Sequence, residues 1–138
     1  MAADPIIVRK SQIIERCVLR IREELGDAKS IEHLGQAQQD SVLLNLERAA
    51  QASIDLGMRV VRIKKLGVPT ESRDAFRLLR AVNLIDEDLH KKMMAMVGFR
   101  NTAVHDYQGL NLTIIDAIVR GHLDDFLSFV AKVLPIQA

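Results

Sequence analysis

Cysteine, tryptophan and long apolar runs are all scarce in this chain. Its 138 residues contain one cysteine, Cys17, and no tryptophan. A single thiol excludes an internal disulfide and is typical of proteins that fold in a reducing compartment. No apolar run approaches the length of a membrane-spanning helix, and the opening residues lack the apolar segment of a signal peptide. We therefore expect a cytoplasmic protein that does not enter a membrane.

An excess of charge of one sign is also lacking. The 19 lysines and arginines nearly balance 18 acids, which leaves a net charge of +1. Any nucleic-acid-binding surface must therefore come from the arrangement of basic residues rather than from their surplus. Two sets recur at helical spacing, and each could contact RNA or be ordinary exposed helix surface. They are Arg59, Arg62 and Lys65, and Arg73, Arg77 and Arg80.

Apolar residues recur with the 3.6-residue period of an α-helix, and no stretch alternates as a strand would. Gly26 can end the first helix. Later helices are predicted over about 40–65, 72–82, 86–105 and 112–134. Four long amphipathic helices with short connections form an up-down bundle, here with one additional short helix. The sequence thus predicts an all-α, up-down four-helix bundle, with residues 1–138 as a single domain.

Helical bundles can hold metals through histidine and glutamate side chains at a fixed spacing. A di-iron bundle uses Glu-x-x-His on each of two helices. Glu87 and His90 form one such pair, but no other histidine of the chain has an acid three residues before it. Paired cysteines for zinc are also missing. We expect no metal site and no cofactor.

Reactive side chains gather in the stretch GFRNTAVHDYQGL, residues 98–110. Arg100 offers a planar, permanently charged fork for phosphate, and His105 can take or give a proton near neutral pH. Together they could cleave RNA without a metal, by assisting attack of the ribose 2′-hydroxyl on the adjacent phosphate. The alternative is a helix end whose cations merely favour the helix dipole.

The spacing within this stretch limits how a site could form. Five residues of an ideal helix separate Arg100 from His105 by about 140° and about 7.5 Å along the axis. Either the helix loosens between them or a second copy of the chain completes the site. Asn101 lies four residues before His105 and can hydrogen-bond the imidazole or a ligand oxygen.

Several sequence blocks resemble one known family in order and spacing. RNTAVHDY matches the R-x-x-x-x-H-x-Y motif of the HepT-like branch of the HEPN superfamily, the toxins of HepT/MntA toxin–antitoxin modules. ASIDLGMRVV, PTESRDAFRLL and MVGFRNTAVHDYQGLN also resemble successive blocks of that family. The resemblance covers the chain from about Asp40 to the C-terminus.

The resemblance implies a metal-independent endoribonuclease on an HEPN-like bundle that forms a homodimer. Arg100 would hold the scissile phosphate, and His105 would act as general acid or base. Asn101 would orient the phosphate or the histidine. Both copies would contribute to a cleft at the dimer interface. The substrate would be tRNA or mRNA, a choice that the sequence leaves open.

The resemblance also implies a way to silence the enzyme. Tyr107 matches the tyrosine to which a cognate MntA-like minimal nucleotidyltransferase, the antitoxin, transfers AMP. The added charge would lie beside Arg100, and the adenosine would fill the cleft. A structural tyrosine that caps the bundle is the alternative. Asp55, within the IDLG block, could support the site or the dimer surface.

A different class of function remains open. Some HEPN relatives are non-catalytic helical modules that dock a nucleotidyltransferase or bind nucleotides. Such relatives typically lack the Arg/His pair, whereas this chain has both Arg100 and His105. We therefore favour the nuclease as the leading hypothesis.

Overall fold

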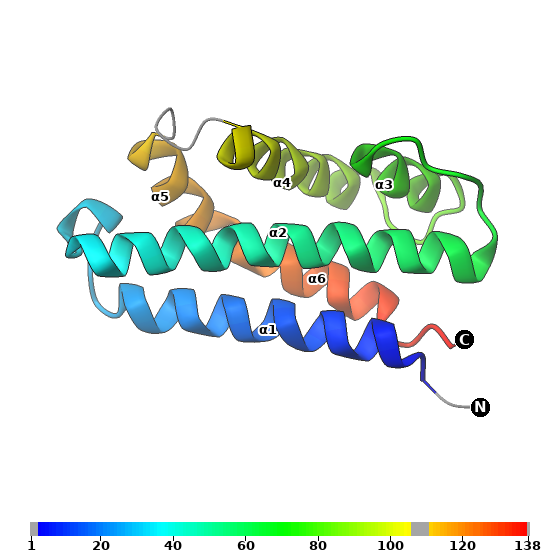
Figure 1. Ribbon diagram of the computed structural model, residues 1–138, viewed down its shortest axis with the longest axis horizontal. Helices are drawn as coiled ribbons and strands as arrows, with labels where there is room; N and C mark the ends of the chain where they lie inside the picture. The colour runs from blue at the N-terminus through cyan, green and yellow to red at the C-terminus, as the bar shows by residue number, and fades with distance from the viewer. Residues whose placement is uncertain (1–2, 106–110, 138) are drawn as a thin grey trace.

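The computed structural model describes residues 3–105 and 111–137, and these are almost entirely helical. The elements follow in the order α1 (Pro5–Leu25), the 3₁₀ helix η1 (Ile31–His33), α2 (Gln36–Lys64), α3 (Ser72–Ala81), α4 (Glu87–His105), α5 (Leu112–Gly121) and α6 (Leu123–Val133). Figure 1 shows α1 and α2 side by side, with α4 along the other side of α2 and α6 behind them. The prediction of an all-α bundle is confirmed.

The core lies where α2 meets the helices around it, since α2 packs on α1, α3, α4 and α6. Phe76 of α3 and Phe129 of α6 are both fully buried, with ring centroids 5.3 Å apart and planes at 64°. This edge-to-face arrangement is favourable for aromatic rings. The ring of Phe76 also packs beside Gly57 of α2, where a Cβ would lie at an ordinary contact distance of 3.6 Å. The short helix α3 is therefore anchored in the core rather than laid over it.

Two predicted helix boundaries were wrong. Helix α2 begins at Gln36, four residues before the predicted start at Asp40. The predicted helix over 112–134 is two helices, α5 and α6, which meet at His122 (φ −130°, ψ 4°). Glycine disfavours the helical state, and Gly121 ends α5. Acids favour a helix N-terminus, and Asp124 and Asp125 lie in the first turn of α6.

The start of α1 is fixed to α2 through Asp4. The buried carboxylate of Asp4 accepts hydrogen bonds from the backbone N–H groups of Ile6 and Ile7, both at 3.0 Å. The same carboxylate binds Arg59 of α2, with Nη2 to Oδ2 at 2.7 Å. Arg59, a candidate RNA contact in the sequence, thus stabilises the fold. The hydrogen bond from Arg59 is the main reason that the pKa of Asp4 lies below its usual value. Burial of the carboxyl group alone would raise this pKa.

This lowered pKa predicts a pH-dependent effect of Asp4→Asn. A carboxyl group whose pKa falls on folding contributes stability above its unfolded pKa, and this contribution is lost as the pH falls through the folded pKa. At pH 7 the variant should melt lower than wild type, by on the order of 10 °C. The difference should begin to narrow near pH 4, where the carboxyl becomes protonated in the unfolded chain, and should shrink further as the pH falls through the lowered pKa of the folded state.

Thermal melting between pH 7 and pH 2.5 measures this effect. Asp27→Asn is the control, because Asp27 is exposed in the turn after α1. A constant gap between wild type and Asp4→Asn across this pH range would contradict the role assigned to Asp4.

Candidate functional site

The motif arginine lies in the last two turns of α4. Asp86 starts this helix as the sequence predicted, since its carboxylate accepts from the Leu89 backbone N–H at 2.8 Å. Arg100 is half-buried, and its Nη1 donates to Oδ1 of Asn101 at 3.2 Å. The structure therefore brings together two of the predicted site residues, the phosphate-binding cation and the neighbouring amide.

An acid that the sequence analysis did not single out lies near the motif arginine. Glu47 of α2 is half-buried, and this burial raises the pKa of its carboxyl group while the charge of Arg100 lowers it. The guanidinium group of Arg100 therefore donates to an amide on its own helix and feels the charge of an acid on α2. The hydrogen bond to Asn101 restricts where the Arg100 side chain can point before substrate arrives.

The backbone of α4 settles one question about the motif. The helix is continuous from Glu87 to His105, so the alternative in which it loosens between Arg100 and His105 is wrong. A single copy therefore presents positions 100 and 105 on different sides of one helix, about 140° apart. The side chain of His105 and the whole of Tyr107 lie outside the described residues.

A small cavity opens next to the motif, where the start of α3 approaches α4. It has a volume of about 210 Å³ and is lined by Glu71, Ser72 and Arg73 together with Asn101 of α4. Nη2 of Arg73 lies 3.6 Å from the position that a Cβ would take at Gly98. A second guanidinium group therefore reaches the surface of α4 close to Asn101.

Of the six basic residues that the sequence offered as candidate RNA contacts, three form ion pairs within the fold. Arg59 binds Asp4, Arg77 binds Asp74 and Arg80 binds Glu87. Arg62, Lys65 and Arg73 are exposed, and no ion pair forms at any of them among residues 3–105 and 111–137. Half of the candidate RNA contacts are thus engaged within the fold.

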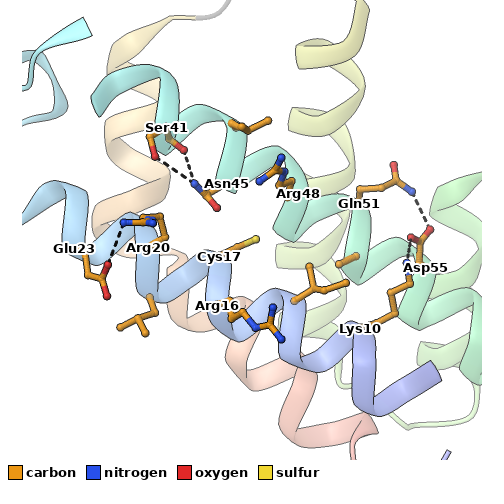
Figure 2. Close-up of a pocket in the computed structure, with 14 residues that line it drawn as sticks. Lys10, Arg16, Cys17, Arg20, Glu23, Ser41, Asn45, Arg48, Gln51 and Asp55 are labelled. Atoms are coloured by element: carbon orange, nitrogen blue, oxygen red, sulfur yellow. Dashed lines mark hydrogen bonds and ion pairs between the residues drawn. The ribbon is translucent and has the colours of Figure 1, made fainter. Parts of the chain in front are cut away.

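Asp55 lies away from the motif arginine, in a groove between α1 and α2 (Figure 2). Its carboxylate accepts from Nζ of Lys10 and from Nε2 of Gln51, both at 2.9 Å. The groove has a volume of about 860 Å³, and Arg16, Arg20 and Arg48 also line it. Asp55 thus links α1 to α2. Within the groove Cys17 is buried, and this burial raises the pKa of its thiol.

A second groove, mostly apolar, runs between α4 and α5. It has a volume of about 610 Å³, and its lining includes Met96, Phe99, Ile114 and Ile118. Sequence reasoning missed it, because the same helical period predicts both a packed face and a face that is only partly covered. Ile114 illustrates the difference, since 58% of its surface is exposed.

No three histidine, cysteine, aspartate or glutamate side chains among the described residues are grouped so that they could hold a metal ion. Glu87 of the lone Glu-x-x-His pair binds Arg80 and lies 3.5 Å from Nδ1 of His90. Over the described ranges no helix is long and apolar enough to cross a bilayer.

Comparison with known proteins gives a consistent result. The family model described as Ribonuclease HepT-like matches residues 14–133. The mRNA nuclease HepT of Shewanella oneidensis is 45% identical over 125 residues, which cover 91% of this chain and 93% of that protein.

Solved structures agree with the sequence match. The tri-AMPylated HEPN toxin of Shewanella oneidensis in complex with MNT antitoxin is 43% identical, with a TM-score of 0.87 over 94% of this chain and 97% of that one. A toxin–antitoxin structure with AMP-PNP is 42% identical, also with a TM-score of 0.87, over 94% of this chain and 98% of that one. The extent of these matches shows that the chain belongs to the HepT-like ribonuclease family.

Proposed function

We propose that this protein is the toxin of a toxin–antitoxin system and that it cleaves RNA without a metal ion. The observation that carries the proposal is the Arg100–Asn101 pair on a continuous α4, five and four residues before His105. The name of its Shewanella oneidensis relative, an mRNA nuclease, supports RNA as the substrate. A protein of this kind acts in the cytoplasm.

In the proposed reaction, the ribose 2′-oxygen attacks the adjacent phosphorus and the bond from phosphorus to the 5′-oxygen breaks. The products are a 2′,3′-cyclic phosphate and a 5′-hydroxyl. His105 takes the proton of the 2′-hydroxyl or gives one to the departing 5′-oxygen. Arg100 neutralises the charge that builds on the phosphate oxygens. Asn101 orients the phosphate or the imidazole.

Two copies of the chain are needed in this proposal. A continuous α4 presents positions 100 and 105 about 140° apart, so one helix cannot aim both side chains at a single phosphate. A homodimer that joins the two α4 ends would bring the arginine and histidine of both copies to a shared cleft. Light scattering of the purified protein should give the mass of two chains.

The most direct test of the activity is RNA cleavage by the purified protein in EDTA. The reaction should proceed as fast in EDTA as in magnesium, because no step uses a metal ion. If RNA stays intact under both conditions, the protein is instead a non-catalytic HEPN module that binds a nucleotidyltransferase or nucleotides.

We further propose that AMP transfer to Tyr107 inactivates the toxin. The related Shewanella oneidensis toxin is tri-AMPylated in its complex with the MNT antitoxin, which supports a nucleotidyltransferase antitoxin as the partner here. A phosphodiester on Tyr107, seven residues after Arg100, would place negative charge where RNA phosphate is expected to bind.

Mass spectrometry tests this step after incubation with ATP and the cognate nucleotidyltransferase. The peptide that contains Tyr107 should gain AMP, and cleavage activity should disappear with the modification. Tyr107→Phe should remain active and unmodified. Equal inhibition with AMP on another residue would contradict the assignment of Tyr107.

A further inference from the structure

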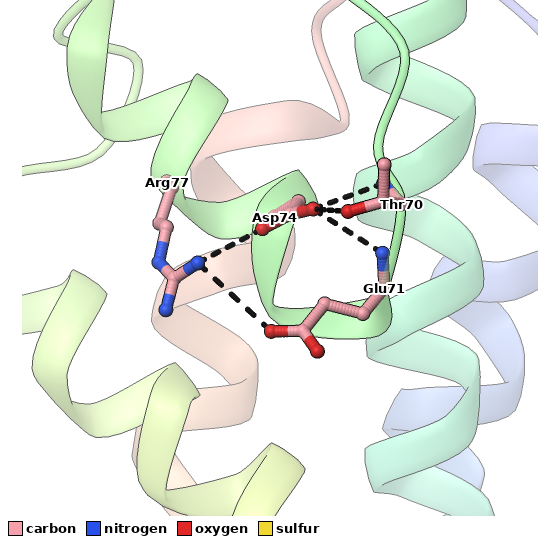
Figure 3. Close-up of polar contacts among 4 residues, drawn as sticks. All are labelled: Thr70, Glu71, Asp74 and Arg77. Atoms are coloured by element: carbon pink, nitrogen blue, oxygen red, sulfur yellow. Dashed lines mark hydrogen bonds and ion pairs between the residues drawn. The ribbon is translucent and has the colours of Figure 1, made fainter.

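The three arginines of α3 share a helical spacing but differ in what they bind. Nη1 of Arg77 lies 2.9 Å from Asp74 and 3.9 Å from Glu71 (Figure 3). Nε of Arg80 lies 3.1 Å from Glu87. Among the described residues no ion pair forms at Arg73, which is exposed. Of the three arginines, Arg73 is thus the one whose charge no acid of residues 3–105 and 111–137 pairs with.

The carboxylate of Asp74, the residue next to Arg73, binds the residues before it and Arg77. One oxygen, Oδ2, accepts from the hydroxyl of Thr70 at 2.6 Å and from the backbone N–H groups of Thr70 and Glu71 at 2.9 Å and 3.2 Å. The other oxygen accepts from Arg77 at 2.9 Å. The hydrogen bond from the Thr70 hydroxyl is the leading reason that the pKa of Asp74 is lowered. Both oxygens of Asp74 are thus hydrogen-bonded to residues at the start of α3 and to Arg77.

Arg73 reaches towards α4 rather than towards these partners. Its Nη2 lies 3.6 Å from the Cβ position of Gly98, and it lines the same cavity as Asn101. Asn101 in turn accepts a hydrogen bond from Arg100. Asn101 therefore bonds to one guanidinium group and shares a cavity with the other. The guanidinium of Arg73 is thus available to an anion that passes beside Asn101.

The helical period shows which face of α4 Arg73 approaches. Position 105 follows position 98 by seven residues, so the two bearings differ by only about 20°, and position 101 is about 60° from position 98. Arg100 points about 140° away from position 105. The guanidinium of Arg73 therefore lies on the face of α4 that ends at His105, where Arg100 of the same copy cannot reach.

We propose that Arg73 binds an RNA phosphate next to the scissile one and so positions the strand along this face of α4. The inference rests on the proposed nuclease function. A guanidinium fork can donate two hydrogen bonds to one phosphate, and the amide of Asn101 can donate to the same strand. Glu71 also borders the cavity, but 62% of its side chain is exposed, so solvent and salt screen its charge.

The first test compares Arg73→Ala with Arg77→Ala on a short single-stranded RNA in EDTA. Both residues are exposed arginines one turn apart on α3, but within the described part of the chain only Arg77 has acidic partners. Arg73→Ala should raise KM about 10-fold, with a smaller change in kcat, because a charged hydrogen bond to the substrate is lost. Arg77→Ala should leave KM close to wild type. Arg73→Lys should recover part of the loss, since it keeps the charge but not the fork.

The second test approaches the same contact from α4. In Gly98→Leu the new side chain would occupy the space beside Gly98 that the Arg73 guanidinium now borders, so KM should rise as in Arg73→Ala. In Gly98→Ala the Cβ would lie at an ordinary contact distance of 3.6 Å, and KM should stay near wild type. Melting temperatures of all variants show whether a change in KM reflects the site or a loss of fold.

A binding measurement distinguishes a phosphate contact from a general loss of structure. For single strands, each neutralised phosphate contributes about 0.7 to the slope of log affinity against log salt concentration. In a His105→Ala background, Arg73→Ala should reduce this slope by about that amount. Equal KM values and equal slopes for Arg73→Ala and Arg77→Ala, with wild type cleaving RNA, would overturn the role of Arg73 alone. A wild-type protein that does not cleave RNA would overturn the proposed function and this inference with it.

Discussion

Replacement of His105 by alanine should reduce RNA cleavage by about 10²–10⁴-fold, the usual contribution of a general acid or base. The loss should appear in kcat, because the imidazole moves a proton only as the phosphate reacts. RNA binding should change much less than cleavage, because Arg100 still holds the phosphate. Single-turnover cleavage of a labelled RNA measures the chemical step directly.

Arg100→Ala should give a loss of comparable size, about 10²–10³-fold, through lost stabilisation of the charged transition state. Arg100→Lys should stay well below wild type in cleavage rate, because lysine keeps the charge but cannot donate through a planar fork.

His33→Ala provides a matched control for His105→Ala, since His33 is exposed in η1. If His105→Ala cleaves as fast as wild type, its assignment as acid or base is wrong.

The largest effect on stability is expected for Phe76→Ala. Phe76 is fully buried, packs edge-to-face on Phe129 and lies against Gly57, so alanine would leave a cavity between α2, α3 and α6. Phenylalanine-to-alanine changes in a core cost about 3–5 kcal/mol. Such a loss is a large share of the free energy of unfolding of a small domain, about 5–15 kcal/mol.

Urea unfolding of wild type, Phe76→Ala and Val82→Ala measures this cost. Val82 is 50% exposed at the end of α3, so Val82→Ala should change the free energy of unfolding by less than about 0.5 kcal/mol. Phe76→Ala should also weaken RNA cleavage, because α3 carries Arg73 to the site. An unfolding midpoint within error of wild type would show that α3 is not anchored by this ring.

Most of the helices could be predicted from the sequence because amphipathic helices repeat every 3.6 residues. The division between α5 and α6 could not, and Val119, Leu123 and Phe126 show why. They keep helical spacing across the break and are all buried, so the apolar pattern is the same for one helix or two. Only Gly121 and the acids after it marked the new start.

The site was predictable only as far as its residues are neighbours in the sequence. Arg100 and Asn101 are adjacent in the sequence, and the structure adds a hydrogen bond between them that the sequence analysis did not predict. Glu47 and Arg73 approach the same stretch from other helices, and no local pattern indicates which partners meet in the fold. Arg59 shows the same limit, since its partner Asp4 is 55 residues away. Spacing alone therefore could not show which of the six basic residues form ion pairs within the fold and which stay exposed as candidate RNA contacts.

The end groups of RNA cleaved in EDTA show most directly whether the 2′-hydroxyl attacks the phosphate with help from Arg100 and His105. Attack by the 2′-hydroxyl with help from Arg100 and His105 should leave only 2′,3′-cyclic phosphate and 5′-hydroxyl ends. These ends should disappear in Arg100→Ala and His105→Ala. Products with 3′-hydroxyl and 5′-phosphate ends, or cleavage that requires added magnesium, would contradict the account.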